Sequence, residues 1–246
     1  MDSNLWNLEK DKQHLFYFGA KHSRNPEDKQ FTEIENYWND FLKRTDGKNK
    51  IVFIESGVKE IYKDKAEAVK KQGEVGFTAF LAQKNNIEHI CPEPNLFTER
   101  EKLLKKFSKE ESQYYYFARA VDSWNRFAFS VPFLEYITPY LERDRTVTEW
   151  DDFDFSIDHM RQIHKEIFHD EFNERNKDFF AKLVNPFSEE TIINKIARES
   201  GYIRDSHIVR KIIEAWEQGK NIFVVYGLGH LNNHKTMLEK KLLENT

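Results

Sequence analysis

Four short hydrophobic runs along the chain end at glycine or proline turn residues, which is the pattern of buried strands. These runs cover residues 15–18, 50–54, 87–91 and 222–226. The apolar positions between the first three recur at helical spacing and predict helices at 29–44, 64–72 and 75–84, the last two joined at Gly73. Apolar strands joined by helical crossovers of this length predict a mostly parallel sheet.

The strand pattern nearly disappears between about residues 96 and 200. Helices are predicted there at 98–107, 109–126, 131–140, 156–172 and 189–199. No Gly/Ser-rich linker borders this stretch, and the chain then returns to an α/β pattern with a helix at 205–218, the last strand and a helix at 235–243. We therefore predict a single α/β domain over residues 1–246, with a central sheet flanked by helices and a large helical insertion at about 96–200.

Each predicted strand is followed closely by a histidine or a glutamate. The first and last strands run into Gly-x-x-His motifs that end at His22 and His230, and the two middle strands are followed by Glu55 and Glu93. In open α/β sheets, ligands bind outside the carboxyl ends of the strands. A buried strand has no packing need for an ionisable group at that point, so the recurrence indicates one shared site.

Two kinds of chemistry fit this set of residues. Two imidazoles and a carboxylate, His22, His230 and Glu55, can bind a divalent metal such as Mn, Co or Zn and leave positions for water and substrate. Without a metal, a histidine oriented by a glutamate can remove a proton from water. The chain has no His-Glu-x-x-His motif, so both alternatives stay open.

Further residues are candidates for substrate contacts. Arg204 can fix a substrate carboxylate or stabilise an oxyanion, and Glu93, Lys21 and Asp205 are candidate substrate-binding residues. Spacing alone favours a simpler interpretation of the Arg204-Asp205 pair, in which Asp205 is a helix N-cap and the arginine is solvated.

The other histidines and the cysteine give weaker evidence of a functional role. His159, His164 and His169 follow one another at intervals of five residues. This spacing places them on different faces of a helix and predicts surface positions. His234 is expected to be a helix-start residue without a further role. Cys91 is expected to be a small buried side chain inside the third strand.

Composition narrows the class of partner and compartment. A net charge of −4 and a pI near 6.2 give no electrostatic case for nucleic acid or an anionic membrane. No run approaches the roughly 20 apolar residues that span a bilayer, and the first residues lack the basic start and apolar core of a signal peptide. The single Cys91 excludes an internal disulfide and a cysteine-based zinc site. We expect a cytoplasmic protein with a small-molecule or peptide substrate.

Five segments together resemble a known superfamily. They are GAKH (19–22), IVFIESG (51–57), CPEPN (91–95), RDSHIVRKI (204–212) and VVYGLGHLNNH (224–234). They resemble the superfamily that unites TraB/PrgY, the Tiki proteases, the erythromycin esterases and the ChaN-like proteins.

The resemblance implies that His22, Glu55, Arg204 and His230 are the functional positions. Because members include a metal-dependent protease, a macrolide esterase and a haem-iron-binding protein, it implies a hydrolase of an ester or amide, or alternatively a non-catalytic protein that binds haem, a metal or a small ligand. Lys21 departs from the small or polar residue of many relatives, and the membrane anchor of the Tiki type is absent. Both departures argue against proteolysis of extracellular substrates.

Overall fold

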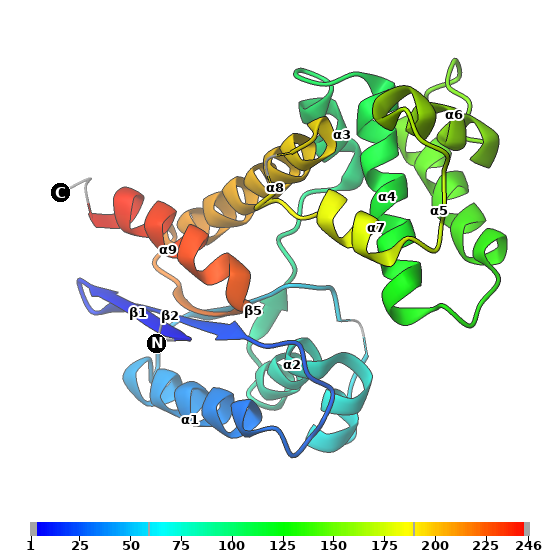
Figure 1. Ribbon diagram of the computed structural model, residues 1–246. Coiled ribbons are helices and arrows are strands. Elements are labelled where there is room, and N and C mark those ends of the chain that lie inside the picture. The colour runs from blue at the N-terminus through cyan, green and yellow to red at the C-terminus, as the bar shows by residue number, and fades with distance from the viewer. Residues whose placement is uncertain (1–3, 59, 189, 244–246) are drawn as a thin grey trace. The chain divides into compact units, whose positions relative to one another are not determined.

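The computed structural model describes residues 4–58, 60–188 and 190–243. The chain divides into two compact units, one formed by Met1–Glu93 with Asp205–Thr246 and the other by Pro94–Arg204. Within the described residues, all strands belong to the first unit, and the second is helical (Figure 1). Glu189, where one predicted helix begins, lies outside the described residues.

The first unit is built on a mostly parallel sheet, as predicted. Its strands are β1 (Leu5–Lys10), β2 (Gln13–Ala20), β3 (Lys50–Ile54), β4 (Glu88–Ile90) and β5 (Asn221–Gly227), in the spatial order β1-β2-β5-β3-β4. The pairs β2–β5, β5–β3 and β3–β4 are parallel, and β1 is antiparallel to β2 at the edge.

Strand β1 was not predicted, because three of its six residues are polar and only Leu8 is buried. It is joined to β2 by Asp11 and Lys12, which both have positive φ (52° and 66°). This is the backbone of a two-residue hairpin turn, without the Asn-Gly or Asp-Gly pair that usually indicates one.

Helices cover both faces of the sheet (Figure 1). Alternate strand residues, such as Phe16, Phe18 and Val225, pack with α1 (Lys29–Arg44) and α2 (Lys65–Lys84). The opposite face packs with α9 (Leu228–Leu243) and the carboxyl-terminal part of α8 (Ile192–Glu217). The predicted break at Gly73 is confirmed, since Gln72 and Gly73 have non-helical backbone angles inside α2.

Two predicted boundaries near the end of the chain are wrong. Residues 192–217 form one continuous helix, so Asp205 lies in the helix interior and is not an N-cap. Helix α9 begins at Leu228, directly after β5, and not at residue 235. Burial of Leu231 and Leu238 against the sheet outweighs the low helix propensity of the glycine and asparagines in its first turns.

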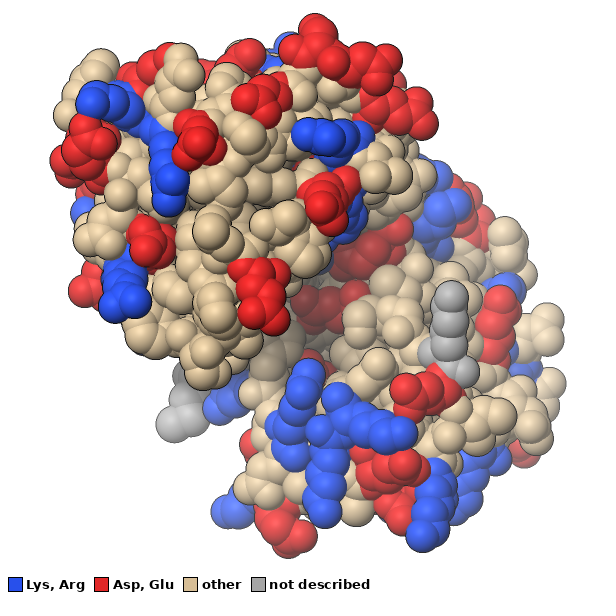
Figure 2. Space-filling model, turned by 90° about the vertical axis from the view of Figure 1, so that its right-hand side faces the viewer, with Lys and Arg blue, Asp and Glu red and all other residues tan. Residues whose placement is uncertain are grey.

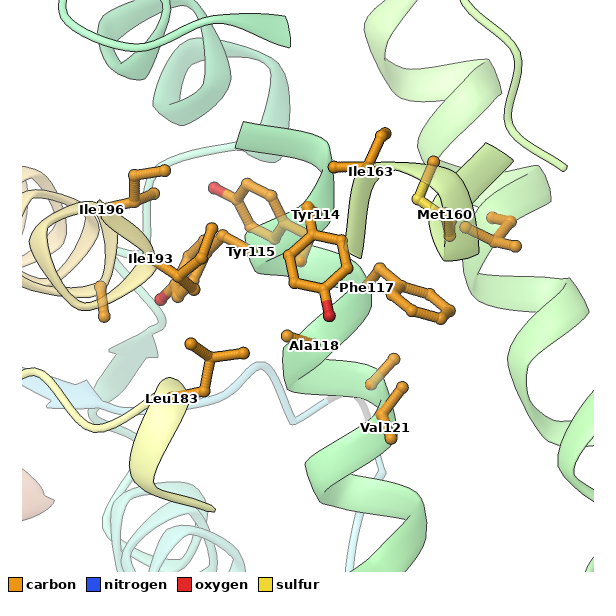
Figure 3. Close-up of a cluster of buried hydrophobic side chains, with 14 of the residues drawn as sticks. Tyr114, Tyr115, Phe117, Ala118, Val121, Met160, Ile163, Leu183, Ile193 and Ile196 are labelled. Atoms are coloured by element: carbon orange, nitrogen blue, oxygen red, sulfur yellow. The ribbon is translucent and has the colours of Figure 1, made fainter. Parts of the chain in front are cut away.

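The helical unit has its own core. Its helices are α3 (Leu96–Leu103), α4 (Lys109–Phe127), α5 (Phe133–Thr148), α6 (Ile157–Phe168), α7 (Lys177–Leu183) and the amino-terminal part of α8. Figure 3 shows Tyr114 and Phe117 of α4 among the buried side chains of this core, which also include Met160 and Ile193. The short α7 was not predicted, and α5 runs past Pro139 to Thr148.

None of the described helices has the length and hydropathy of a membrane-spanning segment. On the face that Figure 2 presents, basic and acidic side chains are mixed.

Candidate functional site

The strands carry the Gly-x-x-His motifs to the same edge of the sheet. In the parallel β2–β5 pair, Gly19 is opposite Tyr226 and Ala20 is opposite Gly227. Strand β3 lies on the other side of β5, with Ile54 opposite Val225. The prediction that the first and last strands of the parallel set are neighbours is confirmed, and His22, Glu55 and His230 follow strand ends at one edge.

Gly19 allows the helix after β5 to lie close to β2. A Cβ atom at Gly19 would lie 2.8 Å from Leu228 Cδ1 and 3.0 Å from Leu231 Cδ2. A larger residue would therefore press on these two leucine side chains in the first turn of α9, which also carries His230.

His22 is held by a buried carboxylate from α2. Its Nδ1 lies 2.7 Å from Glu74 Oε1, and the side-chain exposures are 73% for His22 and 5% for Glu74. The kink positions this pair, because Gly73 has φ of 55° and a Cβ there would be 2.6 Å from Ser23 O. The hydrogen bond that His22 donates to Glu74 raises the pKa of His22 above 6.5, although partial burial acts in the opposite direction.

His230 is held by a second buried carboxylate, Asp205 of α8. Asp205 Oδ1 lies 2.7 Å from His230 Nδ1 and 3.0 Å from His234 Nε2, while Asn233 donates to Oδ2 at 3.0 Å. His234 is fully buried, and its Nδ1 lies 2.8 Å from the hydroxyl of Tyr17.

The pKa shifts determine the donors in this network. Burial alone would raise the pKa of Asp205, but the hydrogen bonds from His230 and His234 hold it well below its usual range. Asp205 is therefore an ionised acceptor, so His230 Nδ1 and His234 Nε2 both donate to it. Burial raises the pKa of Tyr17, so this hydroxyl stays protonated where it meets His234 Nδ1 at 2.8 Å.

Glu55 lies between the two anchored histidines. Its Oε2 accepts a hydrogen bond from the Gly227 amide at 2.7 Å, and its Oε1 lies 3.9 Å from His230 Nε2. A Cβ atom on Gly227 would lie 3.2 Å from Glu55 Oε2 and 3.4 Å from His22 Nε2. The glycine therefore leaves room at the point where the side chains of His22 and Glu55 approach each other.

The remaining candidates are placed as follows. Cys91 lies one residue beyond β4 and is only half-buried, so its prediction as a buried strand residue is wrong; its Sγ is 3.5 Å from Glu55 O. Glu93 lies near the buried Tyr226. Burial raises the pKa of the Tyr226 hydroxyl, and the negative charge of Glu93 adds to this rise. The exposed Lys21 donates its backbone amide to Gln30 Oε1 at 3.0 Å. Arg204 is the last residue of the helical unit, and its role stays a prediction.

The cluster of described residues that could hold a metal shares only His230 with the predicted ligands His22, Glu55 and His230. Among the described residues, the group of three whose ligand atoms all lie within 4.8 Å of one another is Asp205, His230 and His234. Among the described residues, His22, Glu55 and His230 do not form such a group, although Nε2 of His22 lies on the side of the ring that approaches Glu55. The 3.9 Å between His230 Nε2 and Glu55 Oε1 is nevertheless short enough for one ion to bridge this pair with bonds of about 2.0–2.2 Å.

Three residues of the site have no predicted role in function, namely Glu74, His234 and Tyr17. The spacing of His230 and His234, four residues apart, places them on one helix face and is the signal that would have found His234. Glu74 is a lone carboxylate in an apolar helical segment directly after the predicted break. Tyr17 carries no such signal, since it is one of many aromatic strand residues. In the helical unit, His164 is buried against the hydroxyl of Tyr114 at 2.5 Å, so its predicted surface position is wrong.

Two buried tyrosines of the site are expected to respond differently to loss of the hydroxyl. Tyr17→Phe removes the hydrogen bond to His234 and is expected to lower the free energy of unfolding by about 1 kcal/mol. The buried hydroxyl of Tyr226 has no hydrogen-bond partner among the described residues, so Tyr226→Phe is expected to leave stability unchanged or raise it. Urea denaturation of both variants checks this, and an equal loss in both would contradict the network.

No family model matches the chain, and no curated protein or solved structure is similar to it at a significant level. The superfamily resemblance therefore rests on the motifs in the sequence.

Proposed function

We propose that the α/β unit is a hydrolase of an ester or amide bond, with its site at the carboxyl edge of the sheet. The observation that carries the proposal is the paired anchoring of two histidines. His22 and His230 each have Nδ1 on a buried carboxylate, Glu74 or Asp205, and both approach Glu55 with the other side of the ring. A carboxylate that fixes the tautomer and direction of an imidazole is the arrangement that general-base histidines use.

His22 is the better placed base, because its ring is exposed to solvent and its Nε2 is directed to the room above Gly227. In the proposed reaction His22 Nε2 takes a proton from water, the water oxygen bonds to the carbonyl carbon, and the proton then passes to the departing alcohol or amine. Glu55, fixed by the Gly227 amide, orients the water. Arg204 stays the proposed stabiliser of the oxyanion, and Glu93 and Lys21 the proposed substrate contacts. Asp205 was predicted to contact substrate, but it is buried and its oxygens are occupied by His230, His234 and Asn233, so its proposed role is to orient His230.

A divalent metal is compatible with this proposal. His230 Nε2 and Glu55 Oε1 are close enough to share an ion, with Asp205 behind the imidazole as in many metal sites. Such an ion would supply Lewis-acid activation of water or carbonyl. We also propose that residues 96–200 are a helical insertion into the α/β unit and that the protein is cytoplasmic.

A second candidate is metal binding without turnover, which the cluster of Asp205, His230 and His234 favours. The two candidates differ in whether the protein hydrolyses any ester or amide, because a metal-dependent hydrolase would also bind the ion. A binding protein is expected to melt at a higher temperature with Zn, Mn or Co, to lose this shift in His234→Ala, and to show no hydrolysis.

The proposal is tested with a panel of aryl and alkyl esters and amides. His22→Ala and His230→Ala are expected to lower kcat/KM by about 10²–10⁴-fold on any substrate that the wild type cleaves. His169→Asn, which changes an exposed histidine of the helical unit, is the control and is expected to leave activity unchanged. Assays with added metal and with a chelator separate the two mechanisms. Full activity in both site variants would overturn the proposal.

The pH dependence gives a separate test of the His22–Glu74 pair. Glu74→Gln removes the carboxylate that raises the pKa of His22, so the acid limb of the kcat/KM profile is expected to move to lower pH. In the wild type, protonated His22 stabilises the fold below its unfolded pKa of 6.5, and this contribution is lost as pH rises through the raised folded pKa. NMR titration of the His22 ring measures the shift directly, and an unchanged titration in Glu74→Gln would contradict the assignment.

A further inference from the structure

The helical unit contains a cavity that is independent of the proposed hydrolase site. It has a volume of about 430 Å³, and its polar wall is formed by α4 and α5. That wall includes Arg119, Asp122, Arg126 and Arg143, and the apolar part includes Tyr116 and Tyr140. Three guanidinium groups on one cavity wall are an unusual concentration in a chain with a net charge of −4.

The three arginines are only partly neutralised. Arg126 pairs with Asp122 Oδ2 at 2.8 Å, and Arg143 pairs with Asp144 Oδ1 at 2.8 Å. Asp144 is shared with the buried Arg100, whose guanidinium lies 2.7 Å from Asp144 Oδ2. Within the described residues Arg119 forms no ion pair, and its guanidinium lies 5.7 Å from the centre of the Tyr115 ring.

With the buried Arg100 included, four guanidinium groups lie in or directly behind this wall, against the three carboxylates of Glu99, Asp122 and Asp144. A planar guanidinium has five N–H donors and matches the oxygens of phosphate or carboxylate in pairs. Because Arg126 and Arg143 are each about half exposed, their donors are accessible to a molecule in the cavity.

Asp122 adds an independent observation. The residue is 4% exposed, it lines the cavity, and its Oδ1 has no hydrogen-bond partner among the described residues. A buried carboxylate oxygen without a donor is costly, and structures normally satisfy it. A hydroxyl or amino group on a ligand, or a water, would satisfy this oxygen.

We propose that this cavity binds a small phosphate monoester that also carries a hydroxyl or amino group. The phosphate pairs with Arg119, Arg126 and Arg143, and the hydroxyl or amino group donates toward Asp122. The rings of Tyr116 and Tyr140 cover the carbon skeleton between them.

The proposal is tested by calorimetric titration of the full chain with glycerol 3-phosphate and with inorganic phosphate, with glycerol and sodium chloride of equal ionic strength as blanks. Glycerol 3-phosphate is expected to bind with one-to-one stoichiometry and more tightly than inorganic phosphate. Absence of binding by both probes at millimolar concentration, or equal heats with sodium chloride, would overturn the proposal.

Variants locate the binding. Arg119→Ala and Arg143→Ala are each expected to weaken glycerol 3-phosphate at least tenfold, and Asp122→Asn is expected to remove its advantage over inorganic phosphate. Arg161→Ala is the matched control, because Arg161 is an exposed arginine of α6 that pairs with Asp158 at 3.0 Å and does not line the cavity. Binding unchanged in Arg119→Ala, or weakened equally in Arg161→Ala, would contradict the site. Melting temperatures without ligand show whether each variant folds.

Discussion

Replacing Asp205 with alanine is expected to lower the free energy of unfolding by about 2–5 kcal/mol. The substitution removes the acceptor of two imidazole donors, His230 Nδ1 and His234 Nε2, and of the Asn233 amide. His234 is fully buried, so water cannot replace the lost carboxylate at its Nε2. Because alanine is a good helix former, the lower free energy of unfolding would come from the lost hydrogen bonds and not from a weaker α8. Urea denaturation of the variant and the wild type measures it.

Glu217→Ala is the matched control for this experiment, since it removes an exposed carboxylate from the last turn of the same helix and is expected to leave stability unchanged. The pH dependence gives the sign of the effect. Because the folded pKa of Asp205 lies below the ordinary value of 3.8, its stabilisation is present above pH 3.8 and is lost as pH falls through the folded pKa. The free energies of unfolding of the wild type and Asp205→Ala should therefore become more similar in acid. If their difference stayed constant in acid, Asp205 would act through packing and not through its charge.

The positions of four strands and their parallel pairing were predictable because they depend on local signals. Apolar runs closed by glycine or proline mark β2, β3, β4 and β5, and the helical spacing between them indicates crossovers that require parallel pairing. The break at Gly73 was equally local. The antiparallel β1 was missed because an edge strand buries little and so shows a weak hydrophobic pattern.

The anchoring carboxylates were not predictable in the same way. Glu74 is 52 residues from His22 along the chain, and Asp205 is 25 residues from His230. Such pairs are created by packing of α2 and α8 on opposite faces of the sheet, and nothing in the local sequence specifies the partner. The sequence indicated which groups lie at the sheet edge, while the tertiary structure decides which of them are oriented.

A single methyl group at Gly227 is expected to reduce hydrolysis by roughly 10–100-fold without unfolding the protein, since small displacements of catalytic groups have effects of this size. The Cβ of Gly227→Ala would lie 3.2 Å from Glu55 Oε2 and 3.4 Å from His22 Nε2, so these side chains must shift apart by a few tenths of an ångström. The methyl group also occupies the room in which the proposed water is activated. The measurement is kcat/KM on the substrate found with the ester and amide panel, together with the melting temperature.

Gly229→Ala is the matched control, because it adds the same methyl group two residues later. No atom lies within 4 Å of a Cβ at Gly229, and the residue is in the first turn of α9. Alanine there is expected to keep full activity and to raise stability by about 0.5–1 kcal/mol through helix propensity. The comparison separates an effect on the site from an effect on the strand–helix turn. Equal activity in both variants would show that His22 and Glu55 do not work together across Gly227, and the shared site would then be wrong.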